Sequence, residues 1–179
     1  PVDKQAADVK NNSVAILRGN NTHYNNYGNF KSRFKTPETT MFISQPFGEK
    51  EYDLFKFEAL DDGAYASENY KLSISELSAS TDPNYKYGTF KVELRDLYDT
   101  DFNPVVYESY SRVSLDPNAD NYIARVIGDQ KVRLNLDVDD NNEKRLVREG
   151  TYKNNSSRIR IVVSDDVLKG EIPENSLPF

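Results

Sequence analysis

Strict alternation of apolar and polar side chains is the feature of this sequence that most limits its fold. It is clearest in residues 70–75 (YKLSIS), 90–95 (FKVELR) and 132–138 (VRLNLDV). Successive side chains of a β-strand point to opposite faces, so a period of two predicts strands that each bury one face. We therefore expect an aspartate at Val92 or at Leu134 to unfold the protein, because both would lie on inward faces.

Further strands are predicted where β-branched and aromatic residues gather between turn-forming residues. They cover residues 13–18, 39–44, 52–60, 105–113 and 158–163, and residues 145–148 complete a hairpin with 132–138. In residues 52–60 the alternation assigns Phe55 and Phe57 to one face, and this strand is expected to have one buried face. The loop 78–87 most simply joins its two flanking strands as an antiparallel pair.

Two short helices are indicated near the carboxyl end. Residues 122–128 (YIARVIG) carry apolar side chains at helical spacing before Gly128, and Ser164 begins an N-cap cluster for a helix through Leu168 that Gly170 ends. Residues 61–63 (DDG) predict a turn. Because no alternation of strand and helix runs along the chain, we predict an α+β fold, mainly antiparallel β-sheet with two or three short helices.

The length of 179 residues suits one domain. We predict a flexible N-terminal segment over residues 1–12 and a single β-rich α+β domain over 13–179, with one candidate subdivision near residue 103. The two ends, Pro1 and residues 171–179 (EIPENSLPF), lead us to expect a piece of a longer protein.

Composition excludes several classes of function. The 23 basic and 29 acidic residues give a net charge of −6, which argues against a nucleic-acid-binding module. The sequence has no cysteine and one histidine, which removes disulfides, thiol nucleophiles and cysteine-ligated metals. No apolar run approaches the roughly 18 residues that a membrane-spanning helix needs.

The sequence gives only weak signals for a catalytic or metal-binding site. Carboxylates that could pair in a hydrolase fall in polar turns, where both members of a pair would be solvated and ionised. His23 lies in a loop without a nearby Ser/Asp framework. The carboxylates are Asp61, Asp62, Asp96, Asp99 and Asp101.

A calcium loop is imitated by Asp137, Asp139 and Asn141, but Asn142 replaces the glycine of the sharp turn and Arg148 replaces the bidentate glutamate. A solvated hairpin tip is the better interpretation. We therefore predict no catalytic, cofactor-binding or metal-binding residue and no cofactor.

Two sets of surface residues are candidates for contacts. Arg158 and Arg160 alternate on one strand and are predicted to share its solvent face, where they could pair with an acidic face of a neighbouring subunit. Nearby cations are Lys153, Arg145 and Arg148. Tyrosines that could anchor an interface or cap the core are Tyr24, Tyr27, Tyr85, Tyr87, Tyr107 and Tyr110.

A series of short motifs resembles the tail sheath proteins of contractile-tailed (myovirus-type) bacteriophages over residues 42–179. Tyr65 and residues 66–68 depart from the usual turn of that family. The motifs, in order, are 54–59 (LFKFEA), 62–63 (DG), 71–75 (KLSIS), 87–92 (YGTFKV), 95–97 (RDL), 99–101 (DTD), 106–108 (VYE), 115–117 (LDP), 121–125 (NYIAR) and 127–129 (IGD).

The resemblance implies a structural virion protein and no enzyme. Sheath subunits polymerise around the tail tube and contract to drive it through the host envelope, leading to genome ejection. The implied partners are other sheath subunits, the tail tube and the baseplate, without nucleic acid or membrane insertion. The implied location is the phage tail, with the host cytoplasm during assembly. The family's polymerising core would lie outside this piece, so the isolated chain is expected to be monomeric.

Two other functions stay open from the sequence. A β-rich glycan- or cell-surface-binding module would require a concave groove lined by exposed tyrosines. A hydrolase would require two close carboxylates with pKa values pushed apart.

Overall fold

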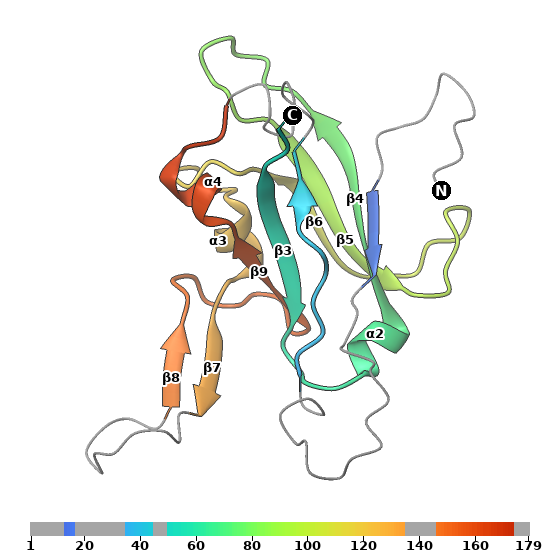
Figure 1. Cartoon of the computed structure of the whole chain (residues 1–179). Coiled ribbons are helices and arrows are strands. Elements are labelled where there is room, and N and C mark those ends of the chain that lie inside the picture. Colours follow the sequence, from blue (N-terminus) through green and yellow to red (C-terminus); the bar gives the residue numbers. More distant parts are fainter. Residues whose placement is uncertain (1–12, 17–34, 45–49, 135–145, 174–179) are drawn as a thin grey trace, which may run out of the picture.

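The computed structural model describes residues 13–16, 35–44, 50–134 and 146–173 (Figure 1). The largest sheet is antiparallel, with the strand order β1-β4-β5-β6. Its strands are β1 (Ser13–Ile16), β4 (Tyr70–Ser78), β5 (Thr89–Asp96) and β6 (Val106–Val113). The predicted antiparallel pairing across the loop 78–87 is confirmed, with Leu72 opposite Leu94.

A second antiparallel sheet has the order β2-β3-β9, and a separate hairpin pairs β7 with β8. These strands are β2 (Phe42–Ile43), β3 (Asp53–Ala59), β7 (Lys131–Leu134), β8 (Leu146–Glu149) and β9 (Ile159–Val163). The predicted strand over 39–44 is thus reduced to two residues. Residues 135–145, at the predicted hairpin tip, lie outside the described residues, as does the segment 1–12.

The helices are α2 (Tyr65–Asn69), α3 (Ile123–Ile127) and α4 (Asp165–Lys169). The two predicted helices are confirmed. The Ser164 hydroxyl accepts a hydrogen bond from the Val167 amide, and Gly170 adopts the left-handed conformation that ends α4. The third helix, α2, falls on residues for which the sequence predicted no helix. There the Glu68 amide donates to the Ala64 carbonyl, and the Asn69 side chain donates to the Tyr65 carbonyl.

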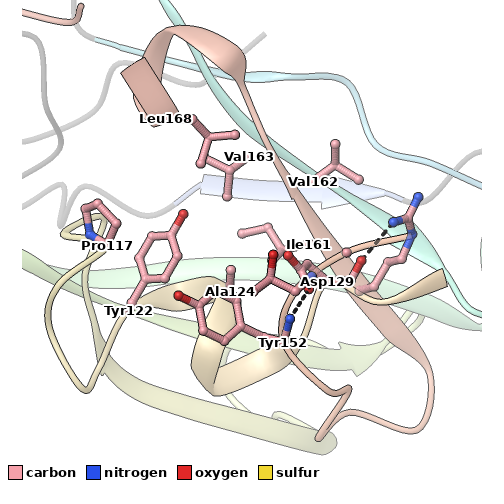
Figure 2. Close-up of a pocket in the computed structure, with 12 residues that line it drawn as sticks. Pro117, Tyr122, Ala124, Asp129, Tyr152, Ile161, Val162, Val163 and Leu168 are labelled. Carbon is pink, nitrogen blue, oxygen red and sulfur yellow. Dashed lines mark hydrogen bonds between the residues drawn. The ribbon is translucent and has the colours of Figure 1, made fainter. Parts of the chain in front are cut away.

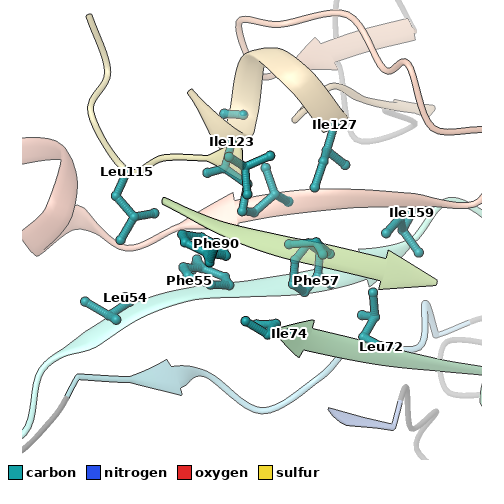
Figure 3. Packing of buried hydrophobic residues seen from close by; sticks show 14 of the residues in the cluster. Leu54, Phe55, Phe57, Leu72, Ile74, Phe90, Leu115, Ile123, Ile127 and Ile159 are labelled. Atoms are coloured by element: carbon teal, nitrogen blue, oxygen red, sulfur yellow. The ribbon is translucent and has the colours of Figure 1, made fainter. Parts of the chain in front are cut away.

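The core lies between the two larger sheets and receives apolar side chains from α3 (Figure 3). Phe55 of β3 stacks on Phe90 of β5, with ring centroids 5.8 Å apart, and so joins the sheets. Ile123 and Ile127 enter the same cluster. Buried residues from both sides of position 103 therefore share one hydrophobic cluster. The α+β architecture, mainly antiparallel, is confirmed.

The expectation of one buried face on β3 is wrong. Phe55 and Phe57 face the core, but Leu54 and Glu58 on the opposite face are also buried. Glu58 is directly opposite Arg160 in the β3–β9 register, so both side chains lie on this second face. A charged pair thus occupies a second buried face of β3, where alternation predicted a single one.

Candidate functional site

The structure describes only some of the candidate residues. His23, Asp137, Asp139, Asn141, Asn142, Arg145, Tyr24 and Tyr27 lie outside the described residues. Asp61 and Asp62 are exposed, as the sequence predicted. The remaining acidic candidates gather at one place, the turn that follows β5.

Asp99 is the centre of an ion cluster at that turn. Its side chain is 0% exposed, and its carboxylate accepts hydrogen bonds at 2.8 Å from both Nε and Nη2 of Arg95. Lys71 Nζ lies 2.6 Å from the same carboxylate, and the Val105 amide donates to it at 2.7 Å. The prediction that Asp99 is solvated is therefore wrong, because the carboxylate is enclosed by cations.

The charges around Asp99 decide its protonation state. Burial by itself raises the pKa of the Asp99 carboxyl, but hydrogen bonds from Arg95, Lys71 and Val105 outweigh burial and hold the pKa well below the ordinary range. The carboxyl therefore stays ionised and cannot act as a general acid near neutral pH. A hydrolytic pair needs a carboxyl with a raised pKa, so this cluster does not supply one.

A second ion cluster lies on the outer face of β3 and β9. Arg160 Nε donates to Glu58 at 3.0 Å, and Lys131 and Lys56 approach the same carboxylate at 3.5 and 3.6 Å. Burial raises the pKa of Glu58, but the Arg160 hydrogen bonds and the three positive charges outweigh it, so the pKa lies below its ordinary value. This carboxylate ties the start of β7 to the body of the protein.

The guanidinium of Arg158 also finds its partners within the chain. Its guanidinium lies over the rings of Tyr70 and Tyr107, at 5.7 and 5.2 Å from the centroids, and contacts Glu108 at 3.3 Å. The prediction that Arg158 and Arg160 share a solvent face is therefore wrong. Both are partly buried and pair with carboxylates of the same chain.

Several candidate tyrosines have structural partners. The Tyr85 hydroxyl donates to Asp116 at 2.6 Å, and the Tyr110 hydroxyl donates to Glu108 at 2.9 Å. Burial and then the carboxylate partner raise the pKa of each of these two hydroxyls to about 12. Tyr107 likewise donates to Asp96. These contacts use the polar ends of the side chains that a glycan-binding groove would need.

One hollow lies beside α3, β9 and α4, with a volume of about 320 Å³ (Figure 2). Tyr122 and Tyr152 form part of its wall, and their rings meet edge to face at 5.9 Å. Tyr122 is buried, so its ring face is not offered to a sugar. At the floor the Tyr152 amide and the Arg160 guanidinium both donate hydrogen bonds to Asp129.

A second hollow, of about 570 Å³, lies between the β7–β8 hairpin and the ends of β3 and β9. Its wall is rich in cations: Lys131, Arg133, Arg148, Lys153 and Arg160. We name it the basic hollow. Neither hollow is lined by any of the four candidate tyrosines that the structure describes, Tyr85, Tyr87, Tyr107 and Tyr110.

Two kinds of feature are absent from the described residues. Within the described ranges, no group of three or more histidine or acidic side chains is arranged to hold a metal ion. Among the helices of the part that the structure describes, none is long and apolar enough to cross a membrane.

Comparison with protein families, with curated proteins and with solved structures finds no match in any of the three. The resemblance to tail sheath proteins therefore depends on the order of the short motifs alone.

Sequence reasoning missed the buried carboxylates Glu58 and Glu108. A signal for Glu58 was present, since an acidic residue in the apolar run LFKFEA has to find a cationic partner when the strand is buried. Its partner Arg160 lies about a hundred residues away, so the sequence offered no local means of pairing the two.

Proposed function

We propose that this chain is part of the tail sheath subunit of a contractile-tailed bacteriophage, with a mechanical role and no catalytic activity. The observation that carries the proposal is what the polar residues of the sheath-like motifs do. Between residues 95 and 129 these side chains form hydrogen bonds and ion pairs with the backbone and with charged side chains of the same chain.

The motifs 95–97 (RDL) and 99–101 (DTD) form the turn after β5. Arg95 joins Asp99 to Asp101, with 2.9 Å between its Nη1 and Asp101 Oδ1. Asp96 accepts from the Tyr98 amide at 2.9 Å, and the Leu97 amide donates to the Asn69 carbonyl at 2.9 Å. The charged residues of these motifs therefore fix a turn between two strands.

The motifs 115–117 (LDP) and 121–125 (NYIAR) fix the entry to α3. Asp116 accepts from the Asn118 amide at 2.9 Å and from the Tyr85 hydroxyl. The Ser114 amide donates to the Asn121 carbonyl, and the Ile123 amide donates to the Ser114 carbonyl, both at 2.9 Å. Tyr122 and Ile123 are buried. This motif holds a short helix against the core.

The motif 127–129 (IGD) closes α3 onto the segment before β9. Gly128 has a φ of +109°, and a Cβ there would lie 2.3 Å from the Asn154 Cα, so only glycine fits. Asp129 Oδ1 accepts from the amides of Thr151 and Tyr152 at 2.9 and 2.6 Å. The polar groups of this motif are therefore occupied within the chain, which supports a role in holding its shape.

Labelling of phage tails tests this proposal. Antibodies raised against the purified chain should decorate a contractile tail along its whole length, at a regular helical repeat, in electron micrographs. Decoration confined to the tail tip or its fibres would favour the glycan- or cell-surface-binding alternative. Absence of decoration from intact and contracted tails would contradict the sheath proposal.

The isolated chain is expected to be monomeric or weakly associated, because the polymerising elements of the family lie outside it. Sedimentation velocity of the 179-residue chain checks this. Stable rings or tubes formed by the chain alone in dilute solution would contradict the placement within the subunit.

A further inference from the structure

The basic hollow carries more positive charge than its own carboxylates balance. Lys131 and Arg160 share Glu58, and Arg133 pairs with Glu149 at 2.7 Å. Arg148 and Lys153 also line the hollow and are exposed. No carboxylate in the described part of the chain lies within ion-pair distance of either. Among the described residues, Arg148 and Lys153 therefore face the cavity without an ion-pair partner, and Asp62 is the one carboxylate that these residues contribute to its wall. The net charge of the whole chain is −6.

Beside these cations lies an exposed apolar strip of the β7–β8 hairpin. Val132 is 56% exposed and Leu146 is 64% exposed. Val132 is opposite Arg148 in the register, and Leu134 is opposite Leu146, so these positions share one face of the hairpin. The hairpin is a separate two-stranded sheet, and such a sheet gains stability when its apolar face is covered.

The turn after β5 has the complementary character. Tyr98 and Phe102 are 82% and 103% exposed, and the Asp101 side chain between them is 87% exposed. Asp96, Asp99 and Asp101 outnumber the cations Lys71 and Arg95 of the same cluster. We name the group of Tyr98, Asp101 and Phe102 the aromatic turn.

The aromatic turn is held firmly in place. Buried Asp99 joins Arg95 and Lys71, and the Asn103 amide donates to the Thr100 carbonyl at 3.0 Å. Two large apolar side chains thus project from a braced backbone. Rigid, projecting aromatic residues lose little conformational freedom on binding and are typical anchors of protein interfaces.

We propose that the aromatic turn of one copy of this chain docks into the basic hollow of a second copy. Phe102 and Tyr98 would cover the apolar strip at Val132 and Leu146. Asp101 would approach Arg148 and Lys153. Charge and hydrophobicity match on both sides, and both surfaces belong to the same chain, which is why a second copy is the occupant.

The positions of the two surfaces give the contact its geometry. The turn after β5 and the β7–β8 hairpin project from opposite sides of the molecule in Figure 1. A contact between two different patches is heterologous, and it repeats from copy to copy into a ring or an open helical array. The docked area is small, so in solution it gives a weak association, with a dissociation constant on the order of 1 mM.

This inference rests on the proposed sheath function for its setting, because a tail brings many copies close together and makes a weak contact effective. The contact itself is tested on the isolated chain. The chain has no cysteine, so Thr100→Cys places one nitroxide label beside the aromatic turn. Spin-labelled chain is mixed with unlabelled, ¹⁵N-enriched chain at about 1 mM, near the expected dissociation constant.

Broadening of amide signals at Val132, Leu146 and Arg148 of the ¹⁵N-enriched copy is the expected result. Arg148→Glu in that copy should abolish the broadening, and Lys86→Glu, an exposed lysine elsewhere with the same change of charge, should leave it intact. Broadening that is absent, that lies elsewhere or that survives Arg148→Glu would overturn the contact.

Reversing the charge on each of the two surfaces gives a test that does not depend on one variant. Asp101→Lys alone and Arg148→Glu alone should each associate several-fold more weakly than the parent chain. A mixture of the two variants should regain association, because the altered turn of one matches the altered hollow of the other. If Asp101→Lys does not fold, Phe102→Ser in the labelled copy serves instead and should also abolish the broadening.

Failure of this inference and failure of the sheath proposal are distinguishable. Antibody decoration of whole tails without intermolecular broadening would leave the sheath role and remove this contact. Broadening at the hairpin without decoration of tails would leave a self-associating protein of another kind.

Discussion

Strands β5 and β7 have equally regular alternation in sequence and opposite surroundings in the structure. In β5, Phe90, Val92 and Leu94 are all buried between the two large sheets. In β7, Val132 is more than half exposed, and its hairpin belongs to neither large sheet. Alternation therefore identifies a strand and its apolar face. Whether that face is buried depends on residues far away in the sequence, which alternation does not show.

The largest expected effect is that of Val92→Asp in β5. Val92 is 0% exposed, so an aspartate there places an unpaired charge in the core at a cost of several kcal/mol. That cost is comparable with the whole stability of a domain, and the chain should be unfolded at room temperature. Circular dichroism checks this, and Val92→Ala, which removes volume without adding charge, is the matched control. A cooperative thermal transition in Val92→Asp would show that β5 is less enclosed than described.

The second prediction compares ion pairs in the same two regions. Asp99→Ala at the end of β5 leaves Arg95 and Lys71 without their shared buried partner and should cost about 2–3 kcal/mol, since Asp101 still contacts Arg95. Glu149→Ala removes the exposed partner of Arg133 on the hairpin and should cost less than about 0.5 kcal/mol. Urea denaturation measures both. Equal losses would mean that the turn after β5 is no better enclosed than the hairpin.

Prediction from sequence succeeded where the determinants are local. The cap at Ser164 and the stop at Gly170 depend on residues within a few positions of each other, and α4 was predicted with nearly correct bounds. Alternation gave β3, β4 and β5, and β-branched and aromatic content gave the other strands of the two large sheets. The tertiary environment decided the rest. The burial of Asp99 depends on Lys71, which approaches from the neighbouring strand β4. The helix α2 buries only Ala66 and has no side-chain cap, so neither apolar spacing nor a capping residue indicated it.

The same limit applies to the candidate site. The cations of the basic hollow come from β7, β8, β9 and the segment before β9, and the sequence grouped several of them only as a late cluster of positive charge. The pairing of Lys131 and Arg160 with Glu58 was invisible because that carboxylate lies on the distant strand β3. The sheath resemblance stays a prediction that the labelling experiment tests.

The third prediction concerns acid. The folded state holds the Asp99 pKa below its unfolded value near 3.8, and holds the Glu58 pKa below its unfolded value near 4.5. Each carboxylate therefore stabilises the fold fully above its unfolded pKa, and this contribution is lost as the pH falls below that value. Urea midpoints should fall between about pH 5 and about pH 2, and the fall should be shallower in Asp99→Asn. The effect of protonation should be smaller than that of Asp99→Ala, because a neutral carboxyl still accepts hydrogen bonds. A midpoint that stays constant over this range would contradict the enclosed geometry of both clusters.

The smallest expected effect, and the sharpest contrast with Val92→Asp, is that of Val132→Asp. The Val132 side chain is already largely in water, so a charge there loses little solvation, and the neighbouring Arg148 can pair with it. The free energy of unfolding should change by less than about 0.5 kcal/mol. This outcome would replace the expectation drawn from alternation that an aspartate in this strand unfolds the protein. At high protein concentration the same variant should lose the broadening from the aromatic turn of a second copy, because the apolar strip is interrupted. A loss of stability comparable with that of Val92→Asp would instead show that the hairpin face is covered within its own chain. Alternation would then predict a buried apolar face correctly in both β5 and β7.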